Sequence, residues 1–385
     1  MYAIRTDVAI AGAGPTGLAL AAELKRLEVF AVILDRLPAG ENTSRAAAVH
    51  ARTLEVLEPL GVTPELIAHG LKIDKFRIWE RSRVLATVSF EGLHTAYPFV
   101  LMIPQQITEA VLLDRLQALG GRVDRPCEVT GITDGADGAS VQYRRNGSLE
   151  TLHAKWLVAC DGMHSVVREQ AAIPFEGGAY EESFILGDVQ MDWPIARDEV
   201  SLFFAPAGLL GVFPLPPDRF RIVATMQAAS PQPSIADFQK VLEERGPETG
   251  PIRLRSCVWS SRFHVHHRVA NTFRKGRILL AGDAAHVHSP AGGQGMNTGI
   301  QDAISLADTL RQVLSQGNEA ALDAWQKKRH EIARDVVTLT DRMTKVGTTS
   351  SPAARLVRNA VLDIVGHVPF AQHAIAQQMS ELDNR

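Results

Sequence analysis

The chain has 385 residues, 45% of them hydrophobic, and a formal net charge of −3. This length and composition allow two sizeable hydrophobic cores. The nearly balanced charge gives no electrostatic case for binding nucleic acid or an anionic membrane. No run approaches the roughly 18 apolar residues that a spanning helix needs, so no transmembrane segment is expected.

The cysteine content indicates a reducing compartment. The three cysteines are scattered without the spacing of a metal site: Cys127, Cys160 and Cys257. We therefore expect a cytoplasmic protein, and no metal site is predicted.

The chain opens with a nucleotide-binding pattern. A strand-like run at 6–11 leads into the turn Gly12–Gly17 and then into a helix at 18–27, while a second strand at 29–34 ends at Asp35. Gly-x-Gly-x-x-Gly between strand and helix, with an acid about 20 residues further on, is typical of a dinucleotide-binding βαβ unit. We expect Asp35 to accept a hydrogen bond from an adenosine ribose.

Short apolar and alternating segments predict a second, antiparallel sheet. Residues 75–79 and part of 84–90 alternate in the manner of a hairpin. Four further strand-like segments are separated by turn residues: 183–189, 199–204, 209–215 and 220–226.

A second polar turn lies between these segments. The strand-like run 156–160 is followed by Asp161 and Gly162, and Arg168 comes shortly after them. An Asp-Gly pair alone is usually only a turn, and a lone arginine is usually a solvated surface charge. They become significant as a candidate motif because they lie between the nucleotide-binding pattern at the start of the chain and a third motif near residue 283.

The third motif combines an acid with a glycine-rich helix start. A buried-strand pattern at 277–281 precedes Gly282 and Asp283, and the segment 290–297 leads into a helix at 296–314. A helix start presents unpaired N–H groups and partial positive charge, and glycines allow an anionic ligand to approach closely. Asp283 can accept hydrogen bonds from sugar-type hydroxyls.

In this order, the three motifs resemble the single-component, class A flavoprotein monooxygenases, a family of FAD-dependent aromatic hydroxylases. The likeness covers roughly residues 5–345, and smaller matches include Ser44–Arg45 and Pro104–Glu109. It is strongest to the phenol- and polyketide-hydroxylase branch. Members of that branch usually carry a C-terminal thioredoxin-like domain, which we do not expect in this chain.

The resemblance implies an α/β fold in which an antiparallel β-sheet substrate domain is inserted into an FAD-binding, Rossmann-like βαβ domain, followed by C-terminal helices. The FAD-binding domain is expected to be discontinuous, over residues 1–72, 98–180 and 265–345. The substrate domain is expected to comprise residues 73–97 and 181–264.

The tail 346–385 is predicted to form helices packed on the body. Gly366 and Pro369 are expected to break it into two pieces. Its first piece carries apolar residues at helical spacing: Leu356, Val357, Ala360, Val361 and Ile364.

The resemblance also implies which residues hold FAD. Asp35 and Arg36 would contact the adenosine, and the backbone of 292–297 would stabilise negative charge at the flavin N1–C2=O edge. The expected cofactor-binding residues are Gly12, Gly14, Pro15, Thr16, Gly17, Asp35, Arg36, Arg45, Gln105, Asp161, Arg168, Gly282, Asp283, Pro290, Gly293, Gln294, Gly295, Met296 and Asn297.

The implied reaction uses NAD(P)H to reduce FAD and O2 to form a C4a-hydroperoxyflavin that hydroxylates a small aromatic substrate, phenolic or polyketide-like. Because the flavin performs the oxygen chemistry, no catalytic side chain is assigned. The oxygen transfer needs a dry pocket. Its expected walls include Phe203, Leu210, Phe213 and Pro214. A monomer and a homodimer are both compatible with the sequence.

Three other functions remain open from the sequence. The first is an antibiotic-inactivating flavin monooxygenase of the tetracycline type. The second is a flavin-dependent reductase or dehydrogenase that inserts no oxygen, and the third is a nucleotide-binding scaffold without activity. Function resides in sites rather than folds, so the motifs alone do not choose among them.

Overall fold

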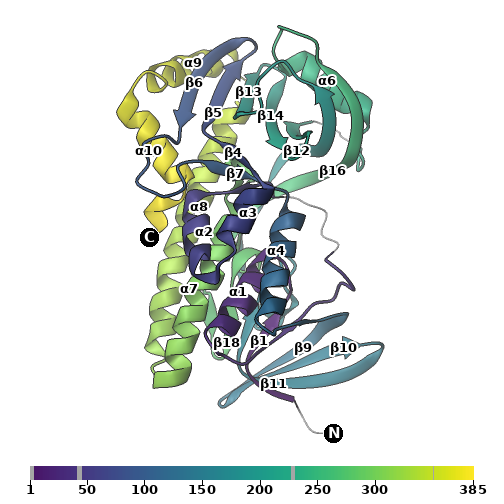
Figure 1. Ribbon diagram of the computed structural model, residues 1–385, viewed down its shortest axis with the longest axis vertical. Coiled ribbons are helices and arrows are strands. Elements are labelled where there is room, and N and C mark those ends of the chain that lie inside the picture. The colour runs from purple at the N-terminus through teal and green to yellow at the C-terminus, as the bar shows by residue number, and fades with distance from the viewer. Residues whose placement is uncertain (1–3, 41–45, 227–229, 350) are drawn as a thin grey trace.

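The computed structural model describes residues 4–40, 46–226, 230–349 and 351–385. One large sheet lies at each end of the molecule, and long helices run along one side (Figure 1). Between the large sheets lies a small one built from β3 (Ala48–Val49), β7 (Val100–Met102) and β4 (Leu71–Ile73).

The first large sheet is the predicted nucleotide-binding sheet. Its strands are β1 (Ile4–Ala11), β2 (Ala31–Leu34), β8 (Val123–Asp124), β9 (Cys127–Gly135), β10 (Gly138–Arg145), β11 (Ser148–Ala159), β17 (Arg274–Lys275) and β18 (Ile278–Leu280). β1 pairs in parallel with β2 and β11, and β11 pairs in parallel with β18. β9 and β10 extend the sheet as an antiparallel pair. The central strands are continuous apolar runs, as expected for strands buried on both faces.

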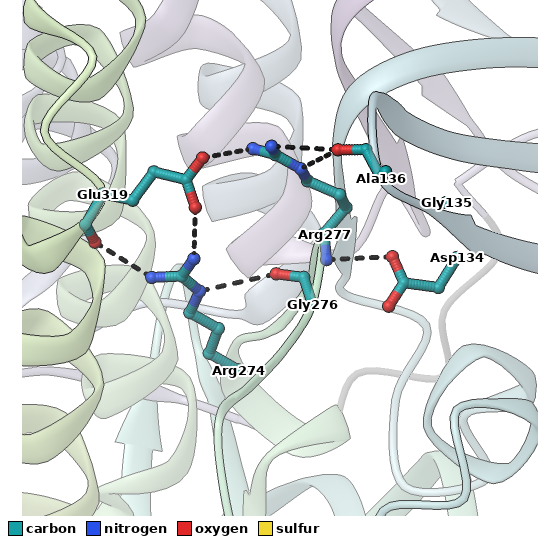
Figure 2. Close-up of a pocket in the computed structure, with 7 residues that line it drawn as sticks. All are labelled: Asp134, Gly135, Ala136, Arg274, Gly276, Arg277 and Glu319. Atoms are coloured by element: carbon teal, nitrogen blue, oxygen red, sulfur yellow. Dashed lines mark hydrogen bonds and ion pairs between the residues drawn. The ribbon is translucent and has the colours of Figure 1, made fainter.

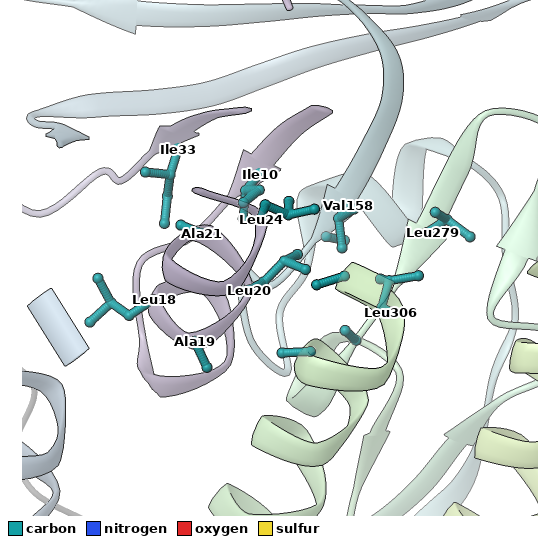
Figure 3. Packing of buried hydrophobic residues seen from close by; sticks show 14 of the residues in the cluster. Ile10, Leu18, Ala19, Leu20, Ala21, Leu24, Ile33, Val158, Leu279 and Leu306 are labelled. Atoms are coloured by element: carbon teal, nitrogen blue, oxygen red, sulfur yellow. The ribbon is translucent and has the colours of Figure 1, made fainter. Parts of the chain in front are cut away.

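Helices α1 (Pro15–Arg26), α4 (Gln105–Ala118) and α7 (Gly295–Gln316) pack together beside this sheet. Proline at the first turn of α1 suits a helix start, where its missing N–H costs nothing. The largest core lies between these helices and the strands (Figure 3). Full burial of one leucine side chain contributes about 1.5–3 kcal/mol. Burial of the many apolar side chains of this core is therefore a main source of the stability of the domain.

The second large sheet confirms the predicted hairpin and the four predicted strands. It contains β5 (Lys75–Glu80), β6 (Arg83–Ser89), β12 (Phe175–Asp192), β13 (Glu199–Ala205), β14 (Gly208–Leu215), β15 (Arg219–Thr225), β16 (Arg253–Ala270) and β19 (His286–Val287). Its pairs are antiparallel except for β13 with β5. Helix α6 (Ile235–Arg245) covers one face and contributes Phe238 to a second apolar core.

Two long strands join the two domains. β12 and β16 pair from Phe175 opposite Ala270 to Asp192 opposite Arg253. The predicted boundaries at 180–181 and 264–265 fall inside this two-stranded ribbon. The connection is therefore a hydrogen-bonded ribbon, which is stiffer than a pair of loops.

The remaining helices lie after β3, after the Asp-Gly turn and in the C-terminal region. Helices α2 (Ala51–Leu57) and α3 (Thr63–His69) follow β3, and α5 (Val166–Gln170) follows the Asp-Gly turn. The C-terminal region forms α8 (Ala320–Thr348), α9 (Pro352–Val365), α10 (Pro369–Met379) and the short turn η4 (Leu382–Asn384). The predicted break between two tail helices is confirmed.

The tail helices contact β6, but with an unexpected face of α9. The buried residue of α9 is Arg358, which donates to the carbonyl oxygen of Phe204 at 3.1 Å, and Asn359 donates to Glu80. The apolar residues that predicted a packing face point outward: Leu356, Val357, Ala360, Val361 and Ile364. Hydrogen bonds, rather than apolar burial, therefore fix the orientation of α9.

The C-terminal residues dock beneath the start of α7. Glu381 accepts hydrogen bonds from the Thr298 hydroxyl at 3.1 Å and from the Gln301 amide, and Gln294 donates to the carbonyl oxygen of Met379 at 3.0 Å. Complete burial raises the pKa of Glu381 to about 8, although Thr298 and Arg329 act in the opposite direction. Glu381 is consequently a protonated, hydrogen-bonded acid at neutral pH.

Among the helices of the described residues, none combines the length and apolar character needed to cross a membrane. Cys127, Cys160 and Cys257 are free thiols. Burial raises the pKa of the Cys160 thiol well above its usual value, so this thiol stays protonated and unreactive.

A buried ion pair in the substrate sheet gives the first prediction. Asp188 binds Arg221 with both carboxylate oxygens, at 2.7 and 2.9 Å, and both side chains are buried. Asp188→Ala leaves the guanidinium uncompensated and should lower the free energy of unfolding by about 3–5 kcal/mol in denaturant titrations. Asp198→Ala, which removes the exposed pair with Lys75, should cost less than about 1 kcal/mol. Equal losses for both variants would contradict the prediction.

The buried Glu381 gives a second prediction, about pH. Between its usual pKa of 4.5 and its folded value of about 8, the folded protein keeps a proton that the unfolded chain has released. The free energy of unfolding therefore falls as pH rises through this window. Glu381→Gln keeps one side-chain oxygen that can accept from Thr298 and carries no titrating group. Its melting temperature relative to that of the wild type should therefore rise from pH 5 to about pH 8 and then level off. Parallel melting curves across this range would show that Glu381 does not titrate as described.

Candidate functional site

The turn after β1 touches the turn after β11. Gly12 has a φ of 98°, and a methyl group on it would lie 2.4 Å from the carbonyl oxygen of Cys160 and 2.9 Å from the Cα of Asp161. The parallel pairing of β1 with β11 also lets the Cys160 N–H donate to the carbonyl oxygen of Ala11 at 2.7 Å. Only glycine fits at position 12, and the first and second motifs are therefore in direct contact.

The third motif meets the first through Thr16. The turn η2 (Gly282–Ala284) follows β18, and Gly282 has a φ of 60°. A methyl group on Gly282 or on Gly299 of α7 would lie 2.5 Å from the Thr16 hydroxyl oxygen. All three motifs thus meet at the carboxyl ends of neighbouring parallel strands, the edge where α/β sheets bind ligands.

The start of α1 is open toward this edge. Gly14 is the N-cap residue and offers no side-chain cap, and a methyl group on it would meet no described heavy atom within 4 Å. By contrast, a methyl group on Gly17 would lie 2.0 Å from the carbonyl oxygen of Gly12. Gly17 is required for packing, whereas Gly14 leaves space for an anion at the positive end of the helix.

Asp35 lies at the end of β2 and turns back toward the glycine turn. Its carboxylate accepts hydrogen bonds from the N–H of Ala13 at 2.6 Å and of Leu37 at 2.9 Å. Arg36 beside it is exposed, and Arg45 lies outside the described residues. Asp35 therefore fixes the shape of the turn, and its remaining lone pairs are the ones left for a ligand hydroxyl.

Gln105 lies at the first position of α4 and binds the chain just after residue 45. Its side-chain oxygen accepts from the N–H of Ala46 at 3.1 Å, and its amide donates to Glu109 at 2.8 Å. Arg221 from the substrate sheet donates to the carbonyl oxygen of the same Ala46 at 3.0 Å. The segment around Ala46 is thus held by both domains.

The Asp-Gly turn is tied to the Gly-Asp turn by Arg168. This buried arginine donates to the carbonyl oxygens of Ala284 at 3.0 Å and Met163 at 2.9 Å, and its guanidinium stacks on Phe175. Burial raises the pKa of Asp161, against hydrogen bonds from Ser165 and Val167. The second carboxylate oxygen of Asp161 finds no hydrogen-bond partner among the described residues, and it is one of the buried polar atoms available to a ligand.

Asp283 is exposed at the tip of the Gly-Asp turn, while the residues around it are buried. The turn itself is held by Asp302 of α7, which accepts from the Gly282 N–H at 3.1 Å and from His286 Nε2 at 2.7 Å. Asp302 also pairs with Arg329 of α8. The exposed Asp283 carboxylate therefore stands on a rigid support.

In the glycine-rich loop, the polar side chains point into the protein. Asn297 is completely buried, accepts from the His50 N–H at 2.9 Å and donates to the carbonyl oxygens of Ala48 at 2.9 Å and Gly293 at 2.8 Å. Gln294 donates to the carbonyl oxygens of Gly292 at 3.2 Å and Met379 at 3.0 Å. These bonds hold the loop in shape and leave its backbone as the surface offered to a ligand.

The remaining residues of this loop are more open. Pro290 is exposed, and Gly293, Gly295 and Met296 are half-buried. Gly293 has a φ of 69°, a conformation that favours glycine. A methyl group on Gly295 would meet only His288, at 3.7 Å, so the first turn of α7 is not crowded by described protein atoms.

The residues predicted for the substrate wall lie on two opposite faces of the sheet. Phe203 and Leu210 are 0% exposed and lie in the core covered by α6, which contains no residue of the glycine-rich loop. Phe213 projects from the other face of the sheet, next to a cluster that contains Ala48. Alternate strand residues face opposite sides, which is why neighbouring apolar residues do not share one wall. Pro214 is buried in the same strand.

Sequence reasoning missed several residues that shape the site. His50 donates from Nε2 to the carbonyl oxygen of Gly292 at 2.7 Å, and burial lowers its pKa to about 4, as it does for His288. Asp302 and Glu381 were missed as well. Each of these contacts joins residues far apart in the chain, so the spacing pattern carried no signal for them. Only His286, shortly after the Gly-Asp pair in the sequence, was a local indication of a buried polar contact at this turn.

A polar hollow elsewhere contrasts with this site. It has a volume of about 350 Å³ and lies at the opposite end of β18 from the Gly-Asp turn (Figure 2). Glu319 binds both Arg274 and Arg277, each at 2.6 Å. The charges around the hollow compensate one another, and none of the residues that line it belongs to the three motifs.

The residues at the three motifs fit FAD on the geometry described. The open helix start at Gly14 suits a pyrophosphate, and the exposed Asp283 suits the hydroxyls of a ribityl chain. Several buried polar atoms at the glycine-rich loop and at the Asp-Gly turn have no hydrogen-bond partner among the described residues: His50 Nδ1, His288 Nε2, Gln294 Oε1 and Asp161 Oδ1. Buried polar groups are ordinarily paired, so these atoms are consistent with a ligand that completes the site.

Comparisons with known proteins agree with this geometry. Residues 5–340 match the family model described as an FAD binding domain. The chain is 37% identical to a flavin-dependent monooxygenase from Mycobacteroides abscessus, over 86% of this chain and 73% of that protein. It is 35% identical to a 6-methylpretetramide 4-monooxygenase from Streptomyces rimosus, over 93% of this chain and 64% of that protein.

A solved structure is similar over its whole length. The p-nitrophenol 4-monooxygenase from Pseudomonas putida has a TM-score of 0.88 and 25% identity, and the match covers 100% of both chains. The matches in sequence and structure extend over both large sheets and the helices between them. The chain therefore belongs to the class A, FAD-dependent aromatic hydroxylase family of flavoprotein monooxygenases.

Proposed function

We propose that this protein binds FAD where the three motifs meet and uses NAD(P)H and O2 to hydroxylate a phenolic or polyketide-like aromatic substrate. The observation that carries the proposal is the contact of Gly12 with Cys160 and of Thr16 with Gly282, which brings the three loops to one sheet edge. An extended dinucleotide placed there reaches the start of α1 and the start of α7 together.

When bound, FAD supplies the hydride acceptance and the oxygen chemistry that no protein side chain provides. The chain contributes binding and electrostatics. The backbone N–H groups in the first turn of α7 would stabilise negative charge on a bound flavin ring. His50 and His288 are buried and neutral, so they add polarity without adding charge.

Two arginines beside the Asp-Gly turn, Arg168 and Arg268, support NAD(P)H as the reductant. His266 and Arg268 on β16 lie near His164 of the Asp-Gly turn, and burial together with the charge of Arg268 lowers the pKa of His266. Burial and the nearby charge of Arg268 lower the pKa of the Arg168 guanidinium. Such a cluster suits the phosphates of a nicotinamide dinucleotide approaching the same turn.

The substrate is proposed to bind between the glycine-rich loop and the face of the second sheet opposite α6. Phe213, Leu202 and Met343 are half-buried at the edge of the cluster that contains Ala48. Met343 of α8 lies 3.5 Å from where a methyl group on Gly292 would be. Apolar walls of this kind keep water away from the reacting centre.

Antibiotic inactivation remains the second candidate, because rifampicin monooxygenases, at 32% and 31% identity, are as similar to the chain as pentachlorophenol 4-monooxygenase, at 30%. Isotope labelling with ¹⁸O2 tests the proposal directly. NADH and NADPH consumption would be followed over a panel of phenols and polycyclic phenols, with hydrogen peroxide measured alongside to detect uncoupled oxidation. Incorporation of one ¹⁸O atom into the product supports the proposal, and turnover without label would identify a reductase or dehydrogenase instead.

Removal of the exposed acid tests the flavin site. Asp283→Ala deletes an acceptor for ligand hydroxyls and should weaken FAD binding by about 1–3 kcal/mol, roughly a 5- to 150-fold increase in the dissociation constant. Flavin content after gel filtration and a fluorescence titration would measure it. Asp137→Ala, at an exposed position of the turn between β9 and β10, is the matched control and should bind FAD like the wild type. Wild-type occupancy in the Asp283 variant would argue against the assigned role.

A substitution at the start of α7 tests the ring site separately. Since described protein atoms leave room for a side chain at Gly295, Gly295→Val should fold with a nearly unchanged melting temperature as the apoprotein. The added bulk would occupy the space proposed for the flavin ring, so FAD should no longer protect the variant from thermal unfolding. A variant that oxidises NAD(P)H at the normal rate would show that the ring binds elsewhere.

A further inference from the structure

The segment that follows α10 supports the candidate site through its backbone. The carbonyl oxygen of Met379 accepts a hydrogen bond from the Gln294 amide in the glycine-rich loop at 3.0 Å. The carbonyl oxygen of the next residue, Ser380, accepts from the N–H of Arg52 at the start of α2, at 3.2 Å. Since His50 joins α2 to the same loop, both contacts hold the glycine-rich loop from inside the protein.

The residue after these two, Glu381, extends the support into α7 with its side chain. One carboxyl oxygen accepts from the Thr298 hydroxyl at 3.1 Å, and the other accepts from the Gln301 amide. Gln301 also donates to the Thr53 hydroxyl of α2 at 3.1 Å. A single carboxyl group is therefore bonded to the first and the second turn of the helix whose start is proposed to face the flavin ring.

Glu381 takes this position against two unfavourable terms. Its φ of 59° lies in the left-handed region, where the residue that follows a helix end is usually glycine. Only 2% of the residue is exposed, and a carboxyl group loses the stabilisation of water when it is buried. Glycine would avoid both terms. Local strain that the surrounding structure holds in place is typical of functional sites, which points to a role for this side chain beyond folding.

We propose that Glu381 is a positioning residue for FAD, which as a neutral acid holds the first two turns of α7 in place and keeps negative charge away from the flavin ring. The inference rests on the FAD site proposed above. The hydrogen bonds fix the direction of the helix start, whose N–H groups would stabilise charge on the ring. An ionised carboxylate behind the same turns would oppose that charge, and salt screens it little because the group is buried. By linkage, reduction of bound FAD should favour the protonated form of Glu381.

The titration of Glu381 can be separated from that of its neighbours. Burial raises its pKa to about 8, so its charge changes between pH 7 and pH 9. Charged and titratable residues face it or its turn from the helices around it and from the C-terminal turn: Asp302 of α7, Lys328 and Arg329 of α8, His50, Arg52 and Glu55 of α2, and Asp383 and Arg385. Glu381→Gln leaves every one of these in place, so the difference between the wild type and this variant isolates one carboxyl group.

The midpoint potential of bound FAD tests the charge. It would be measured against reference dyes under anaerobic conditions from pH 6 to pH 9. The wild type and Glu381→Gln should agree at pH 6, where both side chains are neutral. At pH 9 the wild type should hold reduced FAD, relative to oxidised FAD, at least about fivefold less tightly than the variant does, which for a two-electron couple is a midpoint potential lower by about 20 mV.

Glu199→Gln is the matched control for this measurement. It removes another buried acid, in the substrate sheet, whose pKa is also raised by burial. Glu199 contacts Arg77 and Ser201 and none of the residues at the three motifs. Its variant should therefore follow the wild type at every pH.

Flavin affinity tests the positioning. Glu381→Gly removes the strain and the buried acid together with the contacts to α7, so the apoprotein should melt close to the wild type. Its FAD dissociation constant should nevertheless rise about tenfold or more, as expected for lost hydrogen bonds at the helix start. Glu381→Gln keeps an acceptor for Thr298 and should bind FAD like the wild type at pH 6. A merely structural role would lower the melting temperature of the glycine variant in step with its FAD affinity.

The outcomes separate this inference from the proposed function. Equal potentials of the wild type and Glu381→Gln at pH 9, or a glycine variant that binds FAD as tightly as the wild type, would overturn the role of Glu381 while leaving the FAD site intact. A wild type that binds no FAD would overturn the proposed function, and the inference with it.

Discussion

The candidate site depends on one buried carboxylate. Asp302 is completely buried on α7 and receives the Gly282 N–H, His286 of β19 and Arg329 of α8. Although burial alone would raise its pKa, Arg329 and His286 hold the pKa of Asp302 below its usual value. A buried charge that is compensated in this way is sensitive to the loss of any one partner. These contacts fix the Gly-Asp turn relative to α7 and α8. The backbone that carries the exposed Asp283 is therefore held in place.

A second constraint couples the two domains. Ala46 receives hydrogen bonds at its carbonyl oxygen from Arg221 and donates its N–H to Gln105, so the substrate sheet and the start of α4 hold the same residue. Asp188 in turn fixes Arg221. Together with the continuous β12–β16 ribbon, this network limits how far the substrate sheet can move relative to the nucleotide-binding sheet. Motion at the site is consequently expected in loops rather than between the domains.

The sequence predicted the parts of the molecule that local patterns encode. Both glycine turns, their flanking strands and helices, and the inserted antiparallel sheet follow from the period of apolar residues and from the residues that turns require. Contacts between distant segments were beyond such patterns. Asn297 reaches the backbone of His50, and Glu381 reaches Thr298, through pairings that only the folded chain creates. Apolar character likewise does not tell which face of a strand meets a ligand. Phe203 and Leu210 are as apolar as Phe213, yet they lie under α6.

The C-terminal region contacts the start of α7 with its last residues and exposes the apolar face of α9 to solvent. Its last residues support the start of α7 from inside, through the contacts of Gln294 with Met379 and of Glu381 with Thr298 and Gln301. Its helix α9 faces outward and buries an arginine in place of its apolar side chains. Within a single chain this arrangement leaves apolar surface in water, which is unfavourable by roughly 25 cal/mol per Å².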